Sequence, residues 1–112
     1  LMRDPSSPGP EEGALRSAIS RAYYAAFCNA RNLARDRGEF TPTSSGRDHQ
    51  LVREHFENSS CQIRRKISAD LDRLRDNRNR ADYNDVLNSN PLSLAQSSVT
   101  IARNVLDALD SL

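Results

Sequence analysis

The stretch that decides the fold is ALRSAISRAYYAAFCNARNLARDRG, residues 14–38. Its apolar residues recur at steps of three and four, which is the spacing of one face of an α-helix. They are Leu15, Ile19, Ala22, Tyr23, Ala26, Ala30, Leu33 and Ala34. Tyr24 and Phe27 lie beside this stripe and widen it, so we expect the helix to contact more than one neighbour. Gly38 is expected to end the helix, because glycine tolerates the left-handed conformation that is common just past a helix C-terminus.

The chain after Gly38 carries the signals of two further helices before residue 84. A short helix is expected over about 47–58. Its inward-facing residues are expected to be Leu51, Val52, His55 and Phe56. A longer helix is expected after Asn58-Ser59-Ser60, which can cap its start, and it should end around 81–83. Its apolar stripe is Ile63, Ile67, Leu71 and Leu74.

A last helix is expected to begin at Asn90 and Pro91, a capping residue followed by proline at the first helical position, after a loop at 84–90. Two adjacent apolar rows run along it, and both are expected to be buried in a bundle. The first row is Ala95, Val99, Ala102, Leu106 and Leu109, and the second is Leu94, Ile101, Val105 and Leu112. No stretch alternates as a strand does. The sequence predicts an all-α fold, an up-and-down antiparallel four-helix bundle. A flexible proline-rich arm at 1–10 should precede a single domain at 11–112.

The composition narrows the classes of function. The chain has 112 residues, enough for one domain, of which 37% are hydrophobic and 28% charged. Aromatic residues make up 5% and tryptophan is absent, which argues against a stacking platform for single-stranded nucleic acid. Neither a membrane-spanning run nor a signal peptide is recognisable. Cys28 and Cys61 form no paired motif, so we expect reduced thiols in the core of a cytoplasmic protein.

The residues that usually bind metals or cofactors are sparse. His49 and His55 are the only histidines, and their spacing of six does not match the helical zinc pair. We expect both to have structural roles, and we expect no metal and no cofactor. The four glycines stand alone, so there is no glycine-rich phosphate loop. A cysteine thiolate activated by a histidine is an alternative that nothing in the local sequence supports.

The segment from Arg64 to Arg80 is more informative, because it is basic in a chain of net charge +1. Its seven basic residues are Arg64, Arg65, Lys66, Arg73, Arg75, Arg78 and Arg80, against the acidic Asp70, Asp72 and Asp76. One interpretation is a solvated helix face with offsetting pairs such as Asp72–Arg75. The other is an edge that contacts the phosphates of RNA or a nucleotide.

Arg78 departs from the first interpretation. At about 100° per residue, it continues the line of Ile67, Leu71 and Leu74, so we expect it to point inward. A buried guanidinium needs partners, and Asp82, four residues on, is the nearest local candidate. The residues alone allow either a structural Arg–Asp pair at a helix end or an arginine held in a cleft to bind phosphate.

Two segments resemble the HEPN family of small helical domains. The first, Ser17 to Gly38, is similar to the family's long first helix, through Ser20, Ala22, Tyr23, Tyr24 and Ala25. The second, Leu74 to Asp85, resembles the family's Arg-x-x-Ala-Asp-Tyr signature, here Arg78, Ala81, Asp82 and Tyr83. Between them, a weaker pattern is matched by His49, Val52 and Phe56. The resemblance covers about residues 14–112.

The resemblance implies a helical bundle that forms homodimers, with the signature arginines facing a shared cleft. Many members are metal-independent ribonucleases, often toxins encoded beside a minimal nucleotidyltransferase antitoxin, and others are thought to bind nucleotides. The ribonuclease branch carries a histidine a few residues after the arginine. Tyr83 stands there in this chain, and no histidine follows His55. Tyrosine, with a pKa of about 10, is a poor proton acceptor near neutral pH.

We therefore expect a dimeric nucleotide- or RNA-binding module or toxin–antitoxin component without strong catalysis, with a minimal nucleotidyltransferase as a possible partner. The alternative is a metal-independent endoribonuclease toxin that uses Arg78. A third possibility is a helical interaction protein unrelated to this family. The candidate catalytic residues are Arg78, Asn79, Asp82 and Tyr83. The candidate RNA- or nucleotide-binding residues are Arg75, Arg78, Arg80, Ser20 and Tyr24.

Overall fold

The computed structural model describes residues 10–83 and 90–112, and every regular element in these ranges is a helix. The helices are α1 (Pro10–Asp36), α2 (Asp48–Glu57), α3 (Gln62–Tyr83) and α4 (Pro91–Asp110). The predicted all-α fold is therefore confirmed for the described residues. The arm expected at 1–10 lies outside them apart from Pro10, which opens α1, and the loop expected at 84–90 lies outside them apart from Asn90.

The end of α1 follows the local sequence signal. Gly38 adopts a left-handed φ of 70°. The N–H groups of Gly38 and Glu39 donate to the carbonyl oxygens of Arg35 and Ala34, both at 2.9 Å. This pair of hydrogen bonds is the Schellman motif, which satisfies carbonyls that the helix would otherwise leave unpaired. The expected stop at Gly38 is confirmed.

The start of α4 is also fixed locally. The side chain of Asn90 accepts hydrogen bonds from the N–H groups of Leu92 and Ser93, at 3.0 and 3.3 Å. Pro91 occupies the first turn, where its missing N–H has no intrahelical partner to lose. Before α3, the Ser59 hydroxyl accepts from the N–H of Cys61 at 3.0 Å. These side chains satisfy backbone donors, so both starts follow from residue types near the boundary.

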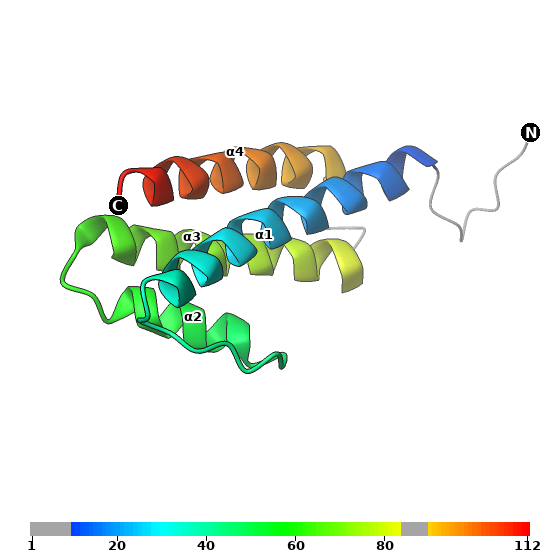
Figure 1. Ribbon diagram of the computed structural model, residues 1–112. Helices are drawn as coiled ribbons and strands as arrows, with labels where there is room; N and C mark the ends of the chain where they lie inside the picture. Colours follow the sequence, from blue (N-terminus) through cyan, green and yellow to red (C-terminus); the bar gives the residue numbers. More distant parts are fainter. Residues whose placement is uncertain (1–9, 84–89) are drawn as a thin grey trace, which may run out of the picture.

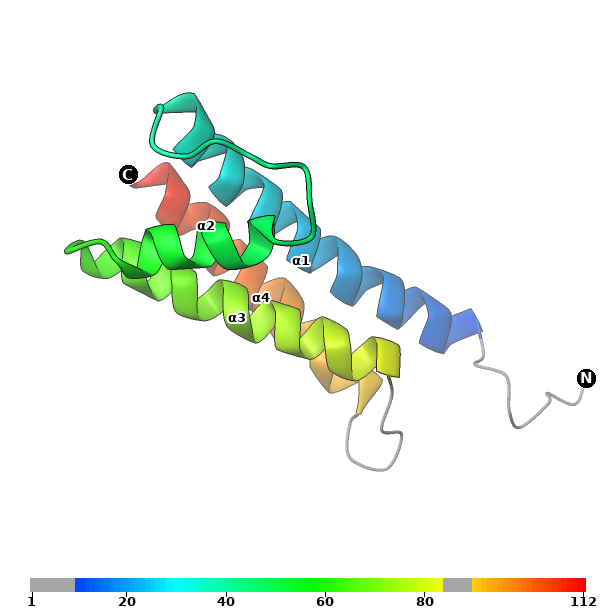
Figure 2. The same cartoon turned by 90° about the horizontal axis from the view of Figure 1, so that it is seen from below.

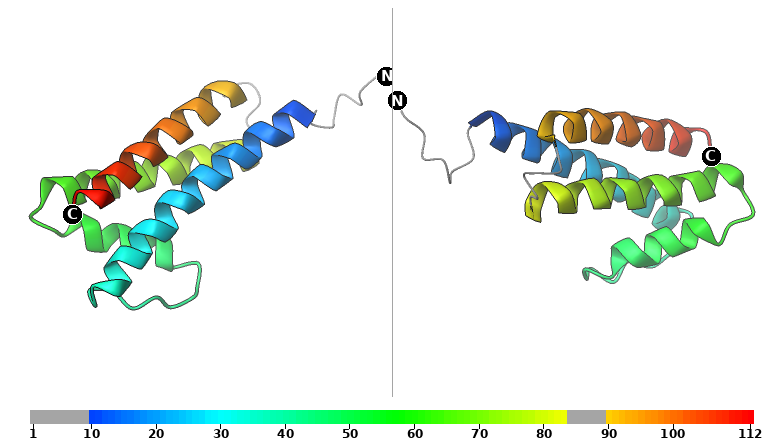
Figure 3. Two further views of the ribbon diagram at one scale, coloured as in Figure 1. Left: turned by 45° about the horizontal axis from the view of Figure 1, so that its top comes forward. Right: turned by 180° about the vertical axis from the view of Figure 1, so that it is seen from behind.

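The helices pack so that α1 contacts all three others. The helices α1, α3 and α4 lie side by side, and α2 packs chiefly on α3 (Figure 1). α3 runs in the opposite direction to both α1 and α4 (Figure 3), whereas the expected up-and-down order would have α1 and α3 run in the same direction. Seen from below, α2 lies between the second half of α1 and the first half of α3 (Figure 2). The wide apolar stripe of α1 is therefore covered within one chain, on three sides.

The core lies where α1, α3 and α4 meet and continues under α2. Its largest fully buried hydrophobic side chains are Phe56, Ile19, Ile67, Leu71, Leu74, Val52 and Val105. Ile63, expected in the same α3 stripe, is instead 42% exposed. The reason is its position in the first turn of α3, at the end of the bundle (Figure 1), where fewer neighbours can cover it. Cys28 and Cys61, expected in the core, are only partly buried.

On α4 only part of the expected apolar surface is covered. Ile101 and Val105 of the second row are buried, whereas Val99 of the first row is 41% exposed. A serine, Ser98, takes a fully buried place on this helix, and its hydroxyl accepts a hydrogen bond from the Asn77 amide of α3 at 3.2 Å. Ala95, Ala102 and Leu109 of the first row are also buried, so the expected burial of the two rows fails clearly at Val99 alone.

An ion cluster fastens the segment after α1 to α2 and α3. The Glu39 carboxylate accepts from Nη1 of Arg64 at 2.7 Å and lies 2.9 Å from Nε2 of His55. These two hydrogen bonds lower the pKa of Glu39 to about 2. The Arg64 guanidinium also lies over the Phe56 ring, 5.5 Å from its centroid. The cluster therefore joins three segments through charge and one aromatic contact.

Candidate functional site

Three helices converge on a cavity of about 420 Å³, called here the three-helix cavity. Its lining residues are Tyr23, Tyr24 and Phe27 of α1, Ser45 and Gly46 just before α2, His49 of α2, and Arg75 and Arg78 of α3. The wall combines aromatic rings with two guanidinium groups. An anion with an apolar or aromatic part would find both kinds of contact in this space.

Arg78 forms one wall of the three-helix cavity. Its guanidinium lies over the ring of Tyr24, at 4.8 Å, and over that of Tyr23, at 5.3 Å. Nε of Arg78 is 3.7 Å from a carboxylate oxygen of Asp82, an ion pair too long for a hydrogen bond. This buried Nε has no hydrogen-bond partner among the described residues. The inward direction predicted for Arg78 and its pairing with Asp82 are confirmed.

A buried hydrogen bond between α1 and α2 forms another wall. The Tyr23 hydroxyl lies 2.7 Å from Nδ1 of His49, and the two side chains are 3% and 6% exposed. Nε2 of His49 is 3.6 Å from the Asp72 carboxylate, which favours the tautomer with its proton on Nε2. In that tautomer the Tyr23 hydroxyl donates to Nδ1. Burial raises the pKa of Tyr23 to about 12, despite the opposing charges of Arg75 and Arg78.

His49 is a neutral histidine near pH 7. Burial is the main reason that its pKa is lowered from the ordinary 6.5, and the positive charge of Arg75 adds to this effect. Asp72, whose carboxylate lies 3.6 Å from Nε2, opposes the shift through its negative charge. Nε2 of His49 is itself buried and has no hydrogen-bond partner among the described residues. Neither ring nitrogen of His49 is therefore free to hydrogen-bond to a molecule bound in the cavity.

Arg75 is the cation of the three-helix cavity that is not neutralised. It is exposed and makes no ion pair with any residue in the described ranges. The expected pair with Asp72 is absent, because Asp72 turns to α2 and lies 3.3 Å from Nε of Arg53. Most other basic residues of α3 have nearby carboxylates, such as the pair Arg80–Asp76 at 3.2 Å. Arg75 is therefore available to an anion that enters the cavity.

The loop that borders the three-helix cavity is held by Asp48 at the start of α2. The Asp48 carboxylate accepts from the hydroxyl of Thr43 and from the N–H groups of Thr43 and Ser44. These hydrogen bonds, led by the Thr43 hydroxyl, lower the pKa of Asp48. Ser44 adopts a left-handed φ of 59°. The arrangement fixes Ser45 and Gly46 at the edge of the cavity.

The structure brings together only some of the residues predicted from sequence. Tyr24, Arg75 and Arg78 line the three-helix cavity, and Asp82 contacts Arg78 from outside it. The residues that do not line it are Ser20, Asn79 and Arg80. Asn79 and Arg80 are exposed, because the helical rotation carries them away from the face of Arg78. Tyr83 ends α3, and its side chain lies outside the described residues.

Five residues that line the cavity were not among the candidates from sequence, namely Tyr23, Phe27, Ser45, Gly46 and His49. His49 was assigned a structural role, and His55 was placed on the inward face of α2 instead. The buried face of α2 is made by Asp48, His49, Val52 and Phe56. The spacing of three and four between His49, Val52 and Phe56 is a helical stripe, and this signal could have identified His49 as inward-facing.

Comparison with known proteins assigns neither a family nor a function to the chain. No protein-family model matches the chain, and no curated protein and no solved structure matches it. The described residues contain no group of three or more His, Cys, Asp or Glu side chains that could hold a metal ion. None of the described helices is long and apolar enough to cross a membrane. A function for this chain must therefore be inferred from the geometry of the three-helix cavity.

Proposed function

We propose that the chain is a HEPN-like module that binds the phosphate group of a nucleotide or of RNA in the three-helix cavity. The observation that carries this proposal is the pair Arg75 and Arg78 on one wall, with Arg75 free of any ion pair among the described residues. A guanidinium is planar and presents several donors, which suits the oxygen atoms of a phosphate. Two guanidiniums on the same wall of the cavity can contact one phosphate together.

The aromatic rings favour a ligand that carries a base as well as a phosphate. The ring of Tyr24 is 47% exposed and lies beside the guanidinium of Arg78. An exposed ring next to a phosphate-binding arginine can stack on a nucleobase while the arginine contacts the phosphate. Tyr23 is too deeply buried to do the same, so its ring supports Arg78 from below.

Other parts of the proposal rest on the HEPN resemblance. These are homodimer formation, a minimal nucleotidyltransferase as partner and a toxin–antitoxin role. In a homodimer, the second copy would meet the face that carries Tyr24 and Arg78, since the signature arginine would then face the shared cleft. The half-exposed ring of Tyr24 is the feature of this face that fits such a contact.

Metal-independent RNA cleavage is the alternative function, and the geometry favours binding over it. Cleavage needs a group that takes a proton from the attacking 2′-hydroxyl. His49 is the histidine nearest to Arg78 in the site, but its Nδ1 is engaged by Tyr23 and its Nε2 is buried. Cleavage would therefore require the Tyr23–His49 hydrogen bond to open when RNA binds.

The proposal is tested by anisotropy titrations in EDTA with two fluorescent probes, a single-stranded RNA of about ten nucleotides and ATP. We expect binding that weakens steeply with salt and falls at least about tenfold in Arg78→Ala, since a hydrogen bond to a charged group contributes about 1.5–3 kcal/mol. Binding of RNA alone would identify a polymer site, and binding of both probes a nucleotide site. Failure of the wild type to bind either probe would overturn the proposal.

The same RNA samples, run on a denaturing gel, separate binding from cleavage. Intact RNA with wild type and with Arg78→Ala is the expected result. RNA cut by the wild type but not by Arg78→Ala would show instead that the cavity is catalytic, and His49→Asn would then be the next variant to assay.

A further inference from the structure

A second hollow lies on the opposite side of α1 from α2, between α1 and α4, and is called here the α1–α4 groove. Its volume is about 500 Å³. It is lined by Ala18, Arg21 and Ala22 of α1 and by Val99, Ala102, Arg103 and Leu106 of α4. None of these residues lines the three-helix cavity, so the two places are independent.

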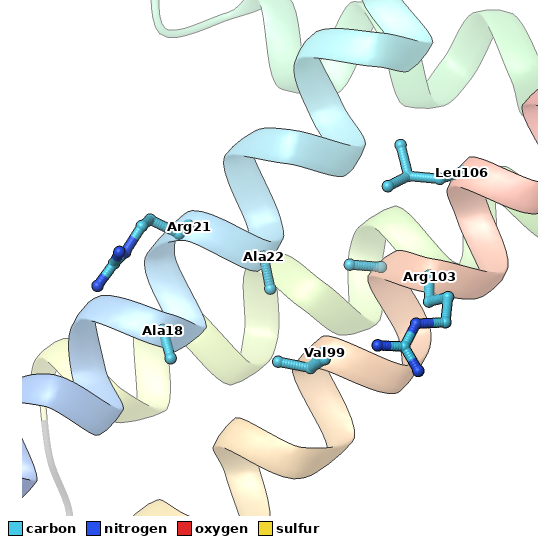
Figure 4. Close-up of a pocket in the computed structure, with 7 residues that line it drawn as sticks. Ala18, Arg21, Ala22, Val99, Arg103 and Leu106 are labelled. Carbon is cyan, nitrogen blue, oxygen red and sulfur yellow. The ribbon is translucent and has the colours of Figure 1, made fainter.

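The floor of the α1–α4 groove is apolar. Figure 4 shows Ala18 and Ala22 directed from α1, and Val99 and Leu106 from α4, toward the space between the two helices. Val99 is 41% exposed, although its position in the apolar row of α4 suits burial. The alanines leave room for side chains from outside. An incoming segment would cover Val99 and Leu106, which the chain itself leaves open.

The rims of the α1–α4 groove are positively charged. Arg103 extends from α4 beside Val99, and Arg21 extends from the side of α1 that faces away from α4 (Figure 4). Arg21 bonds to the Ser17 hydroxyl at 3.0 Å, and neither arginine has an ion pair within residues 10–83 and 90–112. The sequence contains no Asp or Glu between residues 13 and 35 or between 91 and 106. The nearest acid to the groove along α4 is Asp107, one turn after Arg103, and no ion pair joins the two side chains, both of which lie in the described ranges.

This distribution of charge indicates what kind of molecule the α1–α4 groove binds. A second copy of the chain docked groove to groove would bring two arginines from each copy to one interface, against the one nearby carboxylate of Asp107 in each copy, and this excess of positive charge is repulsive. A segment with acidic residues on both sides of an apolar stripe would satisfy the floor and both rims. A helix is the element whose apolar residues, spaced at three and four, fit a groove between two helices.

We propose that the α1–α4 groove docks an amphipathic helix of a partner protein, with an apolar stripe bordered by Asp and Glu. The stretch of α4 from Val99 to Leu106 is about 10 Å long, so about two turns of the partner helix would rest on it. The apolar residues of the partner would bury Val99 and Leu106. Its carboxylates would pair with Arg21 and Arg103 at the partly exposed rims, where they govern specificity and association rate more than affinity.

The proposal is tested with two designed helical peptides of about 20 residues that share one apolar stripe. In one peptide Glu borders the stripe, and in the other Lys stands at every Glu position. Anisotropy titrations with the full chain should show binding of the Glu peptide that is at least about tenfold tighter than that of the Lys peptide and that weakens with salt. Equal binding of the two peptides, or no binding of either below about 1 mM, would overturn the proposal.

Variants assign the binding to the groove. Arg103→Glu and Val99→Glu should each weaken the Glu peptide about tenfold or more, and the double variant Arg21→Glu with Arg103→Glu should prefer the Lys peptide. The matched control is Arg47→Glu, which makes the same charge change on an exposed residue at the start of α2 and should leave Glu-peptide binding unchanged. Weakening by Arg47→Glu equal to that by Arg103→Glu would overturn the assignment.

A last measurement addresses the other possible occupant. If light scattering finds a dimer of the wild-type chain that Val99→Glu converts to a monomer, the groove is occupied by a second copy, and the proposal is wrong. A mass that Val99→Glu leaves unchanged, together with peptide binding that the same variant loses, supports it.

Discussion

At the scale of single residues, the stability of the three-helix cavity depends on a histidine that stays neutral. Because burial lowers the pKa of His49 below 6.5, the native state resists protonation at a pH where the unfolded chain accepts the proton. The unfolded state therefore binds more protons below about pH 6.5. The contribution of neutral His49 to stability should therefore be complete above that pH, and the free energy of unfolding should fall as the pH drops below it.

The variant His49→Asn isolates this effect, because asparagine can still hydrogen-bond to the Tyr23 hydroxyl but does not titrate. We expect a shallower loss of stability than in the wild type, measured by urea unfolding between about pH 8 and pH 5. The control Gln50→Asn places asparagine at an exposed position of the same helix, removes no histidine and should keep the wild-type slope. Identical slopes for the wild type and His49→Asn would show that His49 is not the group that couples folding to pH.

A second pH effect belongs to Glu39, whose folded pKa of about 2 lies below the ordinary value of 4.5. A lowered carboxyl pKa stabilises the fold above about pH 4.5, and this contribution is lost as the pH falls from 4.5 toward 2. Glu39→Gln should be less stable than the wild type at neutral pH, and the difference should shrink over that acid range in thermal unfolding. Glu57→Gln is the control, since the surface carboxylate of Glu57 also pairs with an arginine. If the stability difference between Glu57→Gln and the wild type shrank over the same acid range, the effect would not be specific to Glu39.

At the scale of helices, the two ends of α1 predict opposite effects of the same substitution. Gly38→Ala should destabilise the chain by about 1 kcal/mol, because alanine is strained at a φ of 70°. Gly13→Ala should stabilise it by about 0.5 kcal/mol, because Gly13 lies within α1 and alanine is the better helix former. A Cβ would meet nothing within 4 Å at either position, so the backbone conformation decides whether alanine raises or lowers the stability. Two changes of the same sign in urea unfolding would contradict this explanation.

The helices also show which features a sequence can reveal. The cap at Asn90 and the stop at Gly38 were predictable, because each depends on residues within about one turn, and the inward direction of Arg78 was predictable because it continues the stripe of Ile67, Leu71 and Leu74. The contact of Tyr23 with His49 joins residues 26 positions apart, and no local pattern reports such a pair. Asp72 shows the same limit: a local pair with Arg75 was expected, but packing of α2 on α3 brings Arg53 closer. Half of the candidate site therefore appears only once the helices are packed.

At the scale of the whole molecule, the oligomeric state is open to a direct test. The homodimer was expected from the HEPN resemblance and from the wide apolar stripes of α1 and α4, and packing within one chain covers these stripes except at residues such as Tyr24 and Val99. The half-exposed Tyr24 beside Arg78 remains as a candidate contact. We expect a dimer at micromolar concentration by light scattering, and a monomer for Tyr24→Lys, which adds a charge beside Arg78. Leu92→Lys, a matched change at another exposed apolar residue, should stay dimeric, and a monomeric wild type would contradict the prediction.

Two exposed arginines of α3, Arg75 and Arg80, differ in whether a carboxylate neutralises them and in whether they line the three-helix cavity. Arg80 is exposed and pairs with Asp76 at 3.2 Å, outside the three-helix cavity, whereas Arg75 lines the cavity and has no ion pair among the described residues. The two arginines are five positions apart on one helix and differ mainly in this respect. They form a matched pair for testing whether the cavity, rather than the general basic charge of α3, binds phosphate.

The most direct measurement is the affinity of a labelled single-stranded RNA for wild type, Arg75→Ala and Arg80→Ala in EDTA at one fixed salt concentration. A phosphate site in the three-helix cavity predicts a loss of about tenfold or more for Arg75→Ala and a much smaller loss for Arg80→Ala. Equal losses for the two variants would show that α3 attracts RNA through its charge alone and that the cavity is not the binding site.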